Sequence, residues 1–314
     1  MVKKEKCLVF GGGGFIGSHL CDELLSKDYE VTIFDKINFS KKNITHLINK
    51  IKIIEGDFNN EIDLSGSLKD IDYVFHLVSS TLPATSNENP VYDAETNLIS
   101  SLKLFKECSE IKIKKIIFVS SGGTVYGVPD KIPIRENYNS NPICSYGIIK
   151  KTIEEYLFIF EKIYGLDYYI FRLSNPYGAR QNPLAAQGVI SVFINKVINN
   201  DKITIWGDGK VIRDYIYIKD VVKVLVDSLS KDSQEKIFNL SSGKGHSLNE
   251  IIKLIKKVSG KEIRVENKVG RSIDVPVNVL DNTLIKKIFN WKPKTTIEEG
   301  ISLTYNYLNK INER

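Results

Sequence analysis

The segment Cys7-Leu-Val-Phe-Gly-Gly-Gly-Gly-Phe-Ile-Gly-Ser-His-Leu20 decides the fold. An apolar run enters a cluster of glycines, and apolar residues with helical spacing follow it. This pattern predicts a β-strand, a tight turn and the start of a helix. A helix start offers unpaired N–H donors and a partial positive charge, and glycines let a backbone come close to phosphate groups. The segment therefore predicts a diphosphate-binding turn.

An acidic residue follows the glycines at the distance that dinucleotide binding requires. The apolar run 29–34 reads as a second strand and ends at Asp35, roughly 20 positions after the turn. A carboxylate there would accept both ribose hydroxyls of NAD and repel the 2′-phosphate of NADP. Two alternatives stay open: Asp35 could simply end the strand, and the neighbouring Lys36 leaves NADP possible.

Composition limits the function class. The 314 residues, 42% hydrophobic and 26% charged, predict a soluble globular protein with one large domain and a smaller lobe. The charge of +6 comes from scattered lysines, which disfavours nucleic-acid binding. No window is long and apolar enough for a membrane span, and the N-terminus leads directly into a strand, which disfavours a signal peptide. Four scattered cysteines predict reduced thiols in a cytoplasmic protein, and the histidines show no metal-ligand spacing.

Alternating strands and helices predict an α/β fold with a doubly wound parallel sheet of the Rossmann type. We expect long helices at roughly 91–110 and 146–164 and shorter ones at 188–199, 247–258, 281–288 and 297–311. The expected strands are 5–10, 30–35, 51–55, 72–78, 115–120 and 167–173, with 237–240 as a further one. The nucleotide-binding domain is expected to span 1–175 plus about 212–245. The smaller substrate lobe takes about 176–211 and 246–314.

A tyrosine and a lysine lie four residues apart at the start of the second long helix. The spacing of Tyr146 and Lys150 puts both side chains on one helix face. An ammonium group favours the phenolate, so the tyrosine could take a proton from a sugar hydroxyl. The pair alone is common by chance, but it follows an apolar strand and the loop 120–127 at a suitable distance.

Together these motifs resemble the extended short-chain dehydrogenases/reductases of the NAD-dependent nucleotide-sugar epimerase/dehydratase family, UDP-glucose 4-epimerases in particular. The resemblance covers the whole chain. The motifs that carry it are Gly11-x-x-Gly14-x-x-Gly17, Asp35, Gly56-Asp57-Phe58, His76-Leu77, Asn97, Ser120-Ser121, Val125-Tyr126-Gly127, Tyr146-x-x-x-Lys150, Arg172-Leu-Ser-Asn175-Pro-Tyr-Gly178, Arg213-Asp-Tyr-Ile216 and Arg271-x-x-Asp274. They select the glycine register that starts at Gly11, with Gly12 and Gly13 as tolerated filler.

The resemblance implies a role for each matching position. Tyr146 would be the catalytic acid/base, tuned by Lys150, with Thr124 and Ser121 as nearby hydroxyls. NAD would contact Gly11, Gly14, Phe15, Ile16, Gly17, Asp35, Lys36, Asp57, Phe58, Leu77, Asn97 and Ser120 as well as the Tyr146–Lys150 pair. The substrate, a nucleoside-diphosphate sugar, would contact Thr124, Asn175, Val189, Trp206, Arg213 and Arg271; no metal is expected. Trp206 could equally be a core residue, and a lone arginine is more often a surface ion-pair residue.

Two positions depart from the family pattern. Gly122 stands where 4-epimerases carry a serine or threonine, and the loop lacks the acidic pair of the 4,6-dehydratases, so dehydration is disfavoured. Thr81 stands where sugar epimerases often carry lysine, which suits an enzyme that exchanges NAD. We expect redox chemistry at C4 of the sugar, an epimerase first, a 4-dehydrogenase or 4-ketoreductase second. A non-catalytic NAD-sensing protein is the alternative from another class, and the resemblance implies a homodimer.

Overall fold

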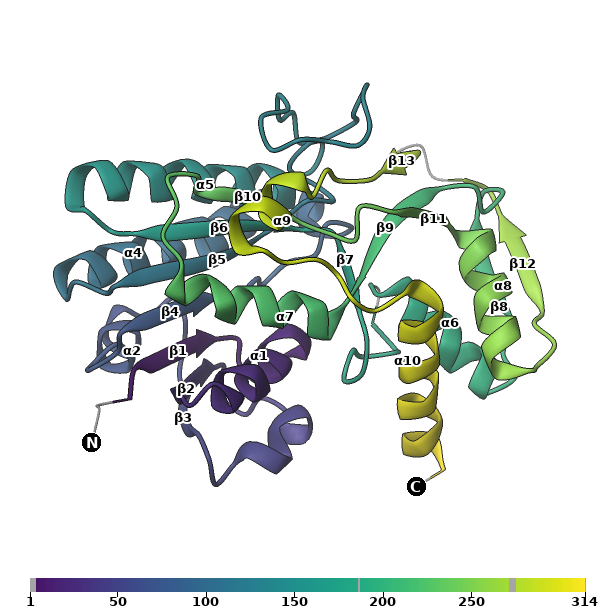
Figure 1. Cartoon of the computed structure of the whole chain (residues 1–314), viewed down its shortest axis with the longest axis horizontal. Helices are drawn as coiled ribbons and strands as arrows, with labels where there is room; N and C mark the ends of the chain where they lie inside the picture. The colour runs from purple at the N-terminus through teal and green to yellow at the C-terminus, as the bar shows by residue number, and fades with distance from the viewer. Residues whose placement is uncertain (1–3, 186, 271–274, 314) are drawn as a thin grey trace. The chain divides into compact units, whose positions relative to one another are not determined.

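A seven-stranded parallel sheet is the main sheet of the computed structural model, which describes residues 4–185, 187–270 and 275–313 (Figure 1). In spatial order its strands are β10 (Ile237–Leu240), β6 (Tyr168–Leu173), β5 (Lys115–Ser121), β4 (Tyr73–His76), β1 (Lys6–Phe10), β2 (Glu30–Asp35) and β3 (Lys52–Glu55). The expected strands and the Rossmann-type fold are thus confirmed. The order reverses between β1 and β4, where such folds bind their ligands.

Helices cover the two faces of this sheet. Right-handed crossovers place helices on opposite faces when the strand order reverses. On one face α2 (Glu61–Ser67) packs on α4 (Ser100–Glu110), which packs on α5 (Ser145–Tyr164). On the other, α1 (Phe15–Ser26) lies beside α7 (Ile218–Asp227), joined by an ion pair between Lys27 and Asp227 (Figure 1).

The core lies between the sheet and the α2–α4–α5 face. Continuous apolar runs such as Ile116–Val119 are buried because both faces of a parallel sheet are covered. Phe10 packs edge-on against Phe58, with ring centroids 5.4 Å apart, and Phe58 lies 5.2 Å from the ring of His76. The carboxyl ends of β1, β3 and β4 are therefore fixed by aromatic packing.

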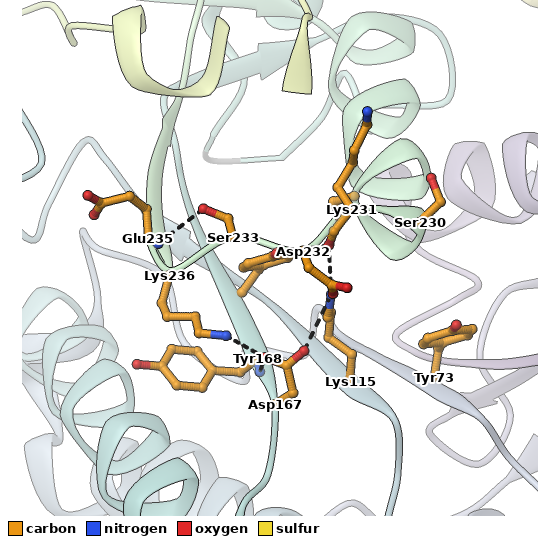
Figure 2. Close-up of polar contacts among 12 residues, drawn as sticks. Tyr73, Lys115, Asp167, Tyr168, Ser230, Lys231, Asp232, Ser233, Glu235 and Lys236 are labelled. Carbon is orange, nitrogen blue, oxygen red and sulfur yellow. Dashed lines mark hydrogen bonds and ion pairs between the residues drawn. The ribbon is translucent and has the colours of Figure 1, made fainter. Parts of the chain in front are cut away.

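The N-terminal edge of β5 and β6 holds a separate polar cluster (Figure 2). The Lys115 ammonium is buried and donates to the Lys231 carbonyl at 2.9 Å, and it pairs with Asp167 at 3.4 Å. Lys236 donates to the same Asp167 carboxylate at 2.6 Å. The cluster fixes the segment that precedes β10 at the sheet edge opposite the glycine turn.

The chain divides into two compact units: Met1–Val128, Asn137–Arg172 and Val222–Phe238 form the first, and Pro129–Glu136, Leu173–Val221 and Asn239–Arg314 the second. The last segment of the first unit is therefore 222–238, whereas 212–245 was expected. The reason is β9 (Ile212–Tyr217), which pairs with the second unit's own strands β7 (Asn175–Tyr177), β11 (Gly245–Ser247) and β13 (Val277–Asn278).

The second unit adds a parallel pair and a group of helices. Strand β8 (Ile203–Trp206) pairs with β12 (Val265–Lys268). Helices α6 (Val189–Ile198), α8 (Leu248–Ser259) and α10 (Ile297–Asn312) pack on one another, and α9 (Thr283–Phe289) precedes α10. These helices lie within one or two residues of the expected bounds.

One expected helix is divided. Residues 91–110 form α3 (Pro90–Asp93), a π-helix η3 (Ala94–Ile99) and α4 rather than one α-helix. A π-turn inserts an extra residue per turn and is often found at functional sites. The other long helix, expected at 146–164, is confirmed as α5.

No helix among the described residues is long and apolar enough to span a bilayer. Cys7, Cys21, Cys108 and Cys144 are free thiols, and the first three are buried. Burial raises the pKa of the Cys7 and Cys108 thiols, so both stay protonated.

Candidate active site

The glycine turn joins β1 to the start of α1. Gly11 has φ +82° and its N–H donates to the Phe34 carbonyl at 2.8 Å. A Cβ on Gly17 would lie 2.2 Å from the Gly11 carbonyl oxygen, so only glycine allows the helix to start this close to the turn. Gly14 is the N-cap of α1, and no side chain of a described residue caps this helix start. Its N–H groups and partial charge are thus left for an anion.

The turn also corrects one expectation. Gly12 and Gly13 are not filler: a Cβ on Gly12 would lie 2.4 Å from the Ile33 side chain, and one on Gly13 would lie 2.3 Å from the Phe39 ring. Contacts this short are essentially never seen. Gly12 and Gly13 therefore lie where β2 and the segment after it come too close to the turn for a side chain.

Asp35 ends β2 and faces this turn. Its carboxylate accepts hydrogen bonds from the N–H of Gly13 at 2.9 Å and of Lys36 at 2.9 Å. Burial raises the pKa of Asp35, and these two hydrogen bonds oppose that rise. The carboxylate therefore helps hold the turn, whereas the Lys36 side chain is exposed.

Three further residues expected at the cofactor lie at the same sheet edge. Asp57 is exposed after β3 and accepts from the Asn59 backbone at 2.9 Å. Phe58 is buried in the core. Leu77 follows β4, and its backbone lies 3.7 Å from where a Cβ of Gly11 would be. Phe15 and Ile16 are half-buried in the first turn of α1.

Tyr146 lies in the first turn of α5, and this helix start is capped from another segment. The N–H of Ser145 donates to the Asn87 side chain at 2.8 Å, and the N–H of Tyr146 donates to the Ser86 hydroxyl at 3.1 Å. The short helix η2 (Ser86–Glu88) supplies both acceptors. The Tyr146 backbone is thereby fixed at a helix start whose own N-cap, Cys144, provides no side-chain bond.

The phenol and the ammonium group lie close but are not in contact. Lys150 is buried, its Nζ donates to the Val119 carbonyl at 3.2 Å, and it lies 5.6 Å from the Tyr146 ring centroid. Burial lowers the pKa of Lys150 to about 8 and raises that of Tyr146 to about 12, while a hydrogen bond with Ser79 opposes the rise at Tyr146. The expected lowering of the phenol pKa by the lysine is therefore not present in this arrangement, because burial dominates.

Sequence reasoning missed the group that links these elements, Asp93. Its carboxylate is fully buried and accepts from the Thr81 hydroxyl at 2.7 Å, the Asn97 amide at 2.8 Å and the Ser145 hydroxyl at 2.6 Å. Asn97 lies on the π-turn and accepts from the Ser80 N–H at 2.8 Å. The only sequence signal was the position of Asp93, four residues before Asn97.

The hydroxyl groups at the end of β5 and in the loop after it differ in burial and in hydrogen bonding. Ser120 donates to the buried Glu154 carboxylate at 2.6 Å, and the same carboxylate pairs with Arg172. Ser121 is half-buried. The Thr124 hydroxyl is buried and has no hydrogen-bond partner among the residues that the structure describes. Thr124 is therefore the hydroxyl left for a ligand.

In the second unit the expected substrate residues lie on several elements. The Asn175 amide donates to the Asp214 carbonyl at 3.0 Å, and Arg213 donates to the Val275 carbonyl at 2.6 Å. Val189 begins α6. Trp206 is 40% exposed at the end of β8, with the Lys268 ammonium 5.6 Å from its ring, so it is not a core residue. Arg271 and Asp274 lie outside the described residues.

Comparison with known proteins identifies the family. The family model described as NAD dependent epimerase/dehydratase matches residues 7–241. The chain belongs to this family. Members are enzymes that use NAD, and this epimerase/dehydratase is one of them.

Relatives match over nearly their whole length. A putative UDP-glucose 4-epimerase of Methanocaldococcus jannaschii is 36% identical, covering 97% of this chain and 99% of the relative. A dTDP-4-dehydro-6-deoxyglucose reductase of Escherichia coli is 33% identical, covering 95% and 96%. The crystal structure of a UDP-glucose 4-epimerase from Thermotoga maritima with UDP-glucose superposes with a TM-score of 0.92 at 37% identity, covering 98% and 99%.

The first unit of this epimerase/dehydratase fits NAD. The uncapped start of α1 at the glycine turn suits a diphosphate, and Asp35 at the tip of β2 suits a ribose. Lys150 and Asn97 lie at the carboxyl edge of the same sheet. NAD supplies reversible hydride transfer when it is bound.

Proposed function

We propose that the protein is a nucleotide-sugar 4-epimerase that acts on a UDP-sugar. The observation that carries this proposal is the loop 120–127 beside the start of α5, which offers the unpartnered Thr124 hydroxyl and no carboxyl group. Removal of water from a sugar needs an additional acidic side chain. Removing hydride from one carbon and giving it back to the same carbon needs only a proton acceptor and a hydroxyl donor. The similarity to UDP-glucose 4-epimerases supports the same class.

Tyr146 takes the central role in the proposed mechanism. Its phenol exchanges a proton with the C4 hydroxyl oxygen of the sugar, taking it as hydride leaves C4 and giving it back on return. The ammonium of Lys150 turns from the Val119 carbonyl toward the phenol and lowers its pKa. Thr124 donates a hydrogen bond to the same oxygen, in place of the side chain that Gly122 lacks. Arg213 pairs with the diphosphate of the nucleotide sugar.

The test incubates the purified protein with NAD and either UDP-glucose or UDP-N-acetylglucosamine, and follows the C4 epimer by proton NMR. We expect the epimer to form without net NADH. Tyr146→Phe should lower turnover about a thousandfold or more while NAD remains bound. Stoichiometric NADH with a keto product would contradict epimerisation, and full activity of Tyr146→Phe would remove the catalytic assignment.

A second candidate is a 4-ketoreductase. The 33% identity to a dTDP-4-dehydro-6-deoxyglucose reductase favours it, because that reaction needs only the return half of the same chemistry. Consumption of NADH with a dTDP-4-keto-6-deoxy sugar, at a rate above the epimerisation of either UDP-sugar, would select this function.

We further propose a homodimer formed through the α4–α5 face of the first unit. Large apolar side chains are exposed along α5: Ile148 is 51% exposed, Ile159 42% and Ile163 65%. Solvated helix faces rarely carry such a row. Light scattering after size exclusion should give a dimer for the protein and a monomer for Ile159→Glu/Ile163→Glu; a wild-type monomer would contradict the proposal.

The free cysteines suit a reducing compartment, so we place the enzyme in the cytoplasm.

A further inference from the structure

The second unit contains a cavity of about 710 Å³ between β9, the turn after β10 and the segment that joins α9 to α10. This volume is in the range of small-molecule sites. Its wall includes four lysines, Lys244, Lys286, Lys292 and Lys294. Among the described residues no carboxylate lies within ion-pair distance of these four ammonium groups. Four cations around one concavity repel one another unless an anion binds between them.

A buried hydroxyl in the same wall has no partner. Tyr215 lines the cavity and is 5% exposed, and its hydroxyl makes no hydrogen bond with any described residue. Burial raises the pKa of Tyr215 to about 12, so the phenol stays protonated and can donate. A buried hydroxyl without a partner costs free energy, and a bound acceptor would remove that cost.

Poor packing of this strand does not explain the missing partner. The adjacent Asp214 is fully buried and accepts from the Ser242 N–H at 2.9 Å, the Ser242 hydroxyl at 2.7 Å and the Gly243 N–H at 3.0 Å. The buried Asp214 carboxylate is thus well satisfied, whereas the Tyr215 hydroxyl beside it has no partner among the described residues.

The wall that carries two of the lysines is rigid. Trp291 is buried, and its ring N–H donates to the Asp220 carbonyl at 3.1 Å. The Asp220 carboxylate accepts from the Thr295 N–H at 2.9 Å. Lys292 and Lys294 lie between these two anchors, so their Cα positions are fixed without a contact from their own side chains. Burial lowers the pKa of His246 in the same wall, which favours its neutral form.

We propose that this cavity is a second anion site, which binds a small molecule carrying two or more phosphate groups. The lysines pair with the phosphates, and the Tyr215 hydroxyl donates to one phosphate oxygen. The lysines of this site are separate from Arg213 and the glycine turn, whereas Tyr215 lies on the same strand as Arg213 and pairs with Asn175 of β7.

The test measures the Kd of inorganic pyrophosphate by titration calorimetry at constant ionic strength. We expect Lys292→Gln/Lys294→Gln to weaken binding about tenfold or more, since each charged hydrogen bond is worth about that factor. Lys253→Gln/Lys310→Gln makes the same change of charge on helices of the same unit, away from the cavity, and should stay within about twofold of wild type. Equal weakening in both double variants would show non-specific attraction and overturn the proposal.

Two further variants separate this site from the one proposed for the nucleotide sugar. Arg213→Gln should weaken pyrophosphate binding at the cavity less than Lys292→Gln/Lys294→Gln does, since Arg213 acts on Tyr215 only through its charge. Loss of binding in Arg213→Gln together with full binding in Lys292→Gln/Lys294→Gln would overturn the proposal. Tyr215→Phe keeps the ring and should weaken binding about fivefold with an unchanged urea midpoint; unchanged binding in Tyr215→Phe would remove the hydroxyl from the site.

Discussion

The Ser145 hydroxyl donates a 2.6 Å hydrogen bond to the fully buried carboxylate of Asp93. This bond links the residue before Tyr146 to the π-turn that carries Asn97. Asp93 also accepts from Thr81, which stands where related epimerases often have lysine. One carboxylate therefore fixes three segments around the proposed catalytic tyrosine.

Asp93→Asn should destabilise the protein and slow turnover. An amide can accept at only one of its two positions, so at least one of the three buried donors loses its acceptor, at a cost of about 2–4 kcal/mol in the free energy of unfolding. Urea unfolding measures this cost. Asp70→Asn, at an exposed position with φ +62°, is the matched control and should change little. An unfolding free energy for Asp93→Asn equal to that of the control would contradict the prediction.

Alanine substitutions should separate constrained glycines from free ones. Gly13→Ala puts a Cβ 2.3 Å from the Phe39 ring, so we expect a loss of about 1–3 kcal/mol and weaker NAD binding. Gly66→Ala, in α2, meets nothing within 4 Å and should gain about 0.5–1 kcal/mol through higher helix propensity. Thermal unfolding and fluorescence titration with NADH measure the two effects. A Gly13→Ala protein as stable as Gly66→Ala would mean that the turn can move away.

Thr124→Val should leave stability intact and reduce turnover. The hydroxyl has no partner among the described residues, so its replacement by a methyl group of similar size removes no hydrogen bond from the folded protein. If it donates to the reacting oxygen, kcat should fall about a hundredfold with little change in KM. Ser121→Ala is the comparison. A large loss in Ser121→Ala and none in Thr124→Val would assign the role to Ser121 instead.

Lys150 should make stability rise with pH. Burial lowers its pKa in the folded state to about 8, below the unfolded value of 10.5, so the unfolded chain binds more protons between these values. The free energy of unfolding therefore gains a contribution of about 3 kcal/mol as pH rises from 8 to 10.5, and the contribution is lost as pH falls again. Lys150→Met should abolish this part of the rise, whereas Lys106→Met, exposed on α4, should not. Parallel pH profiles of Lys150→Met and wild type would contradict the pKa.

Lys115→Met should lower stability without touching catalysis. The Lys115 side chain is 4% exposed, but Asp167 is 32% exposed and Asp232 fully so, which keeps the expected loss to about 1–2 kcal/mol. The cluster lies at the N-terminal edge of β5, whereas Tyr146 lies at the carboxyl edge, so kcat should stay the same. Asp232→Asn is the control and should be neutral. A changed kcat in Lys115→Met would indicate coupling across the sheet.

The sheet could be predicted from the sequence because its strands are continuous apolar runs bounded by turns. A short continuous apolar run such as Ile116–Val119, bounded by turns, fits a buried strand better than any other element. The helix at 91–110 was only partly predicted, since its composition carries no sign of a π-turn. The π-turn depends on the tertiary contacts of Asn97 with Ser80 and Asp93.

At the site, residue identity could be predicted better than local environment. Tyr146 and Lys150 were found from their spacing, but burial, which sets both pKa values, depends on the whole fold. Ser120 looked like a ligand-facing hydroxyl, yet the core pair of Glu154 and Arg172 takes it. Asp93 was missed because its three partners are 4 to 52 residues away and only the fold brings them together.

The π-turn at Ala94–Ile99 sets a limit on how this chain can change in length. Deleting one residue there would restore a regular α-helix and rotate everything after it by about 100°. Leu104 and Phe105, both fully buried, would then turn out of the core, or Asn97 would turn away from Ser80 and Asp93. Neighbouring side chains can adjust to a substitution in this segment, but they cannot compensate for a change in the number of its residues. We therefore expect natural variants of this protein to accept insertions and deletions in their surface loops and to keep the number of residues between Asp93 and Leu104 unchanged.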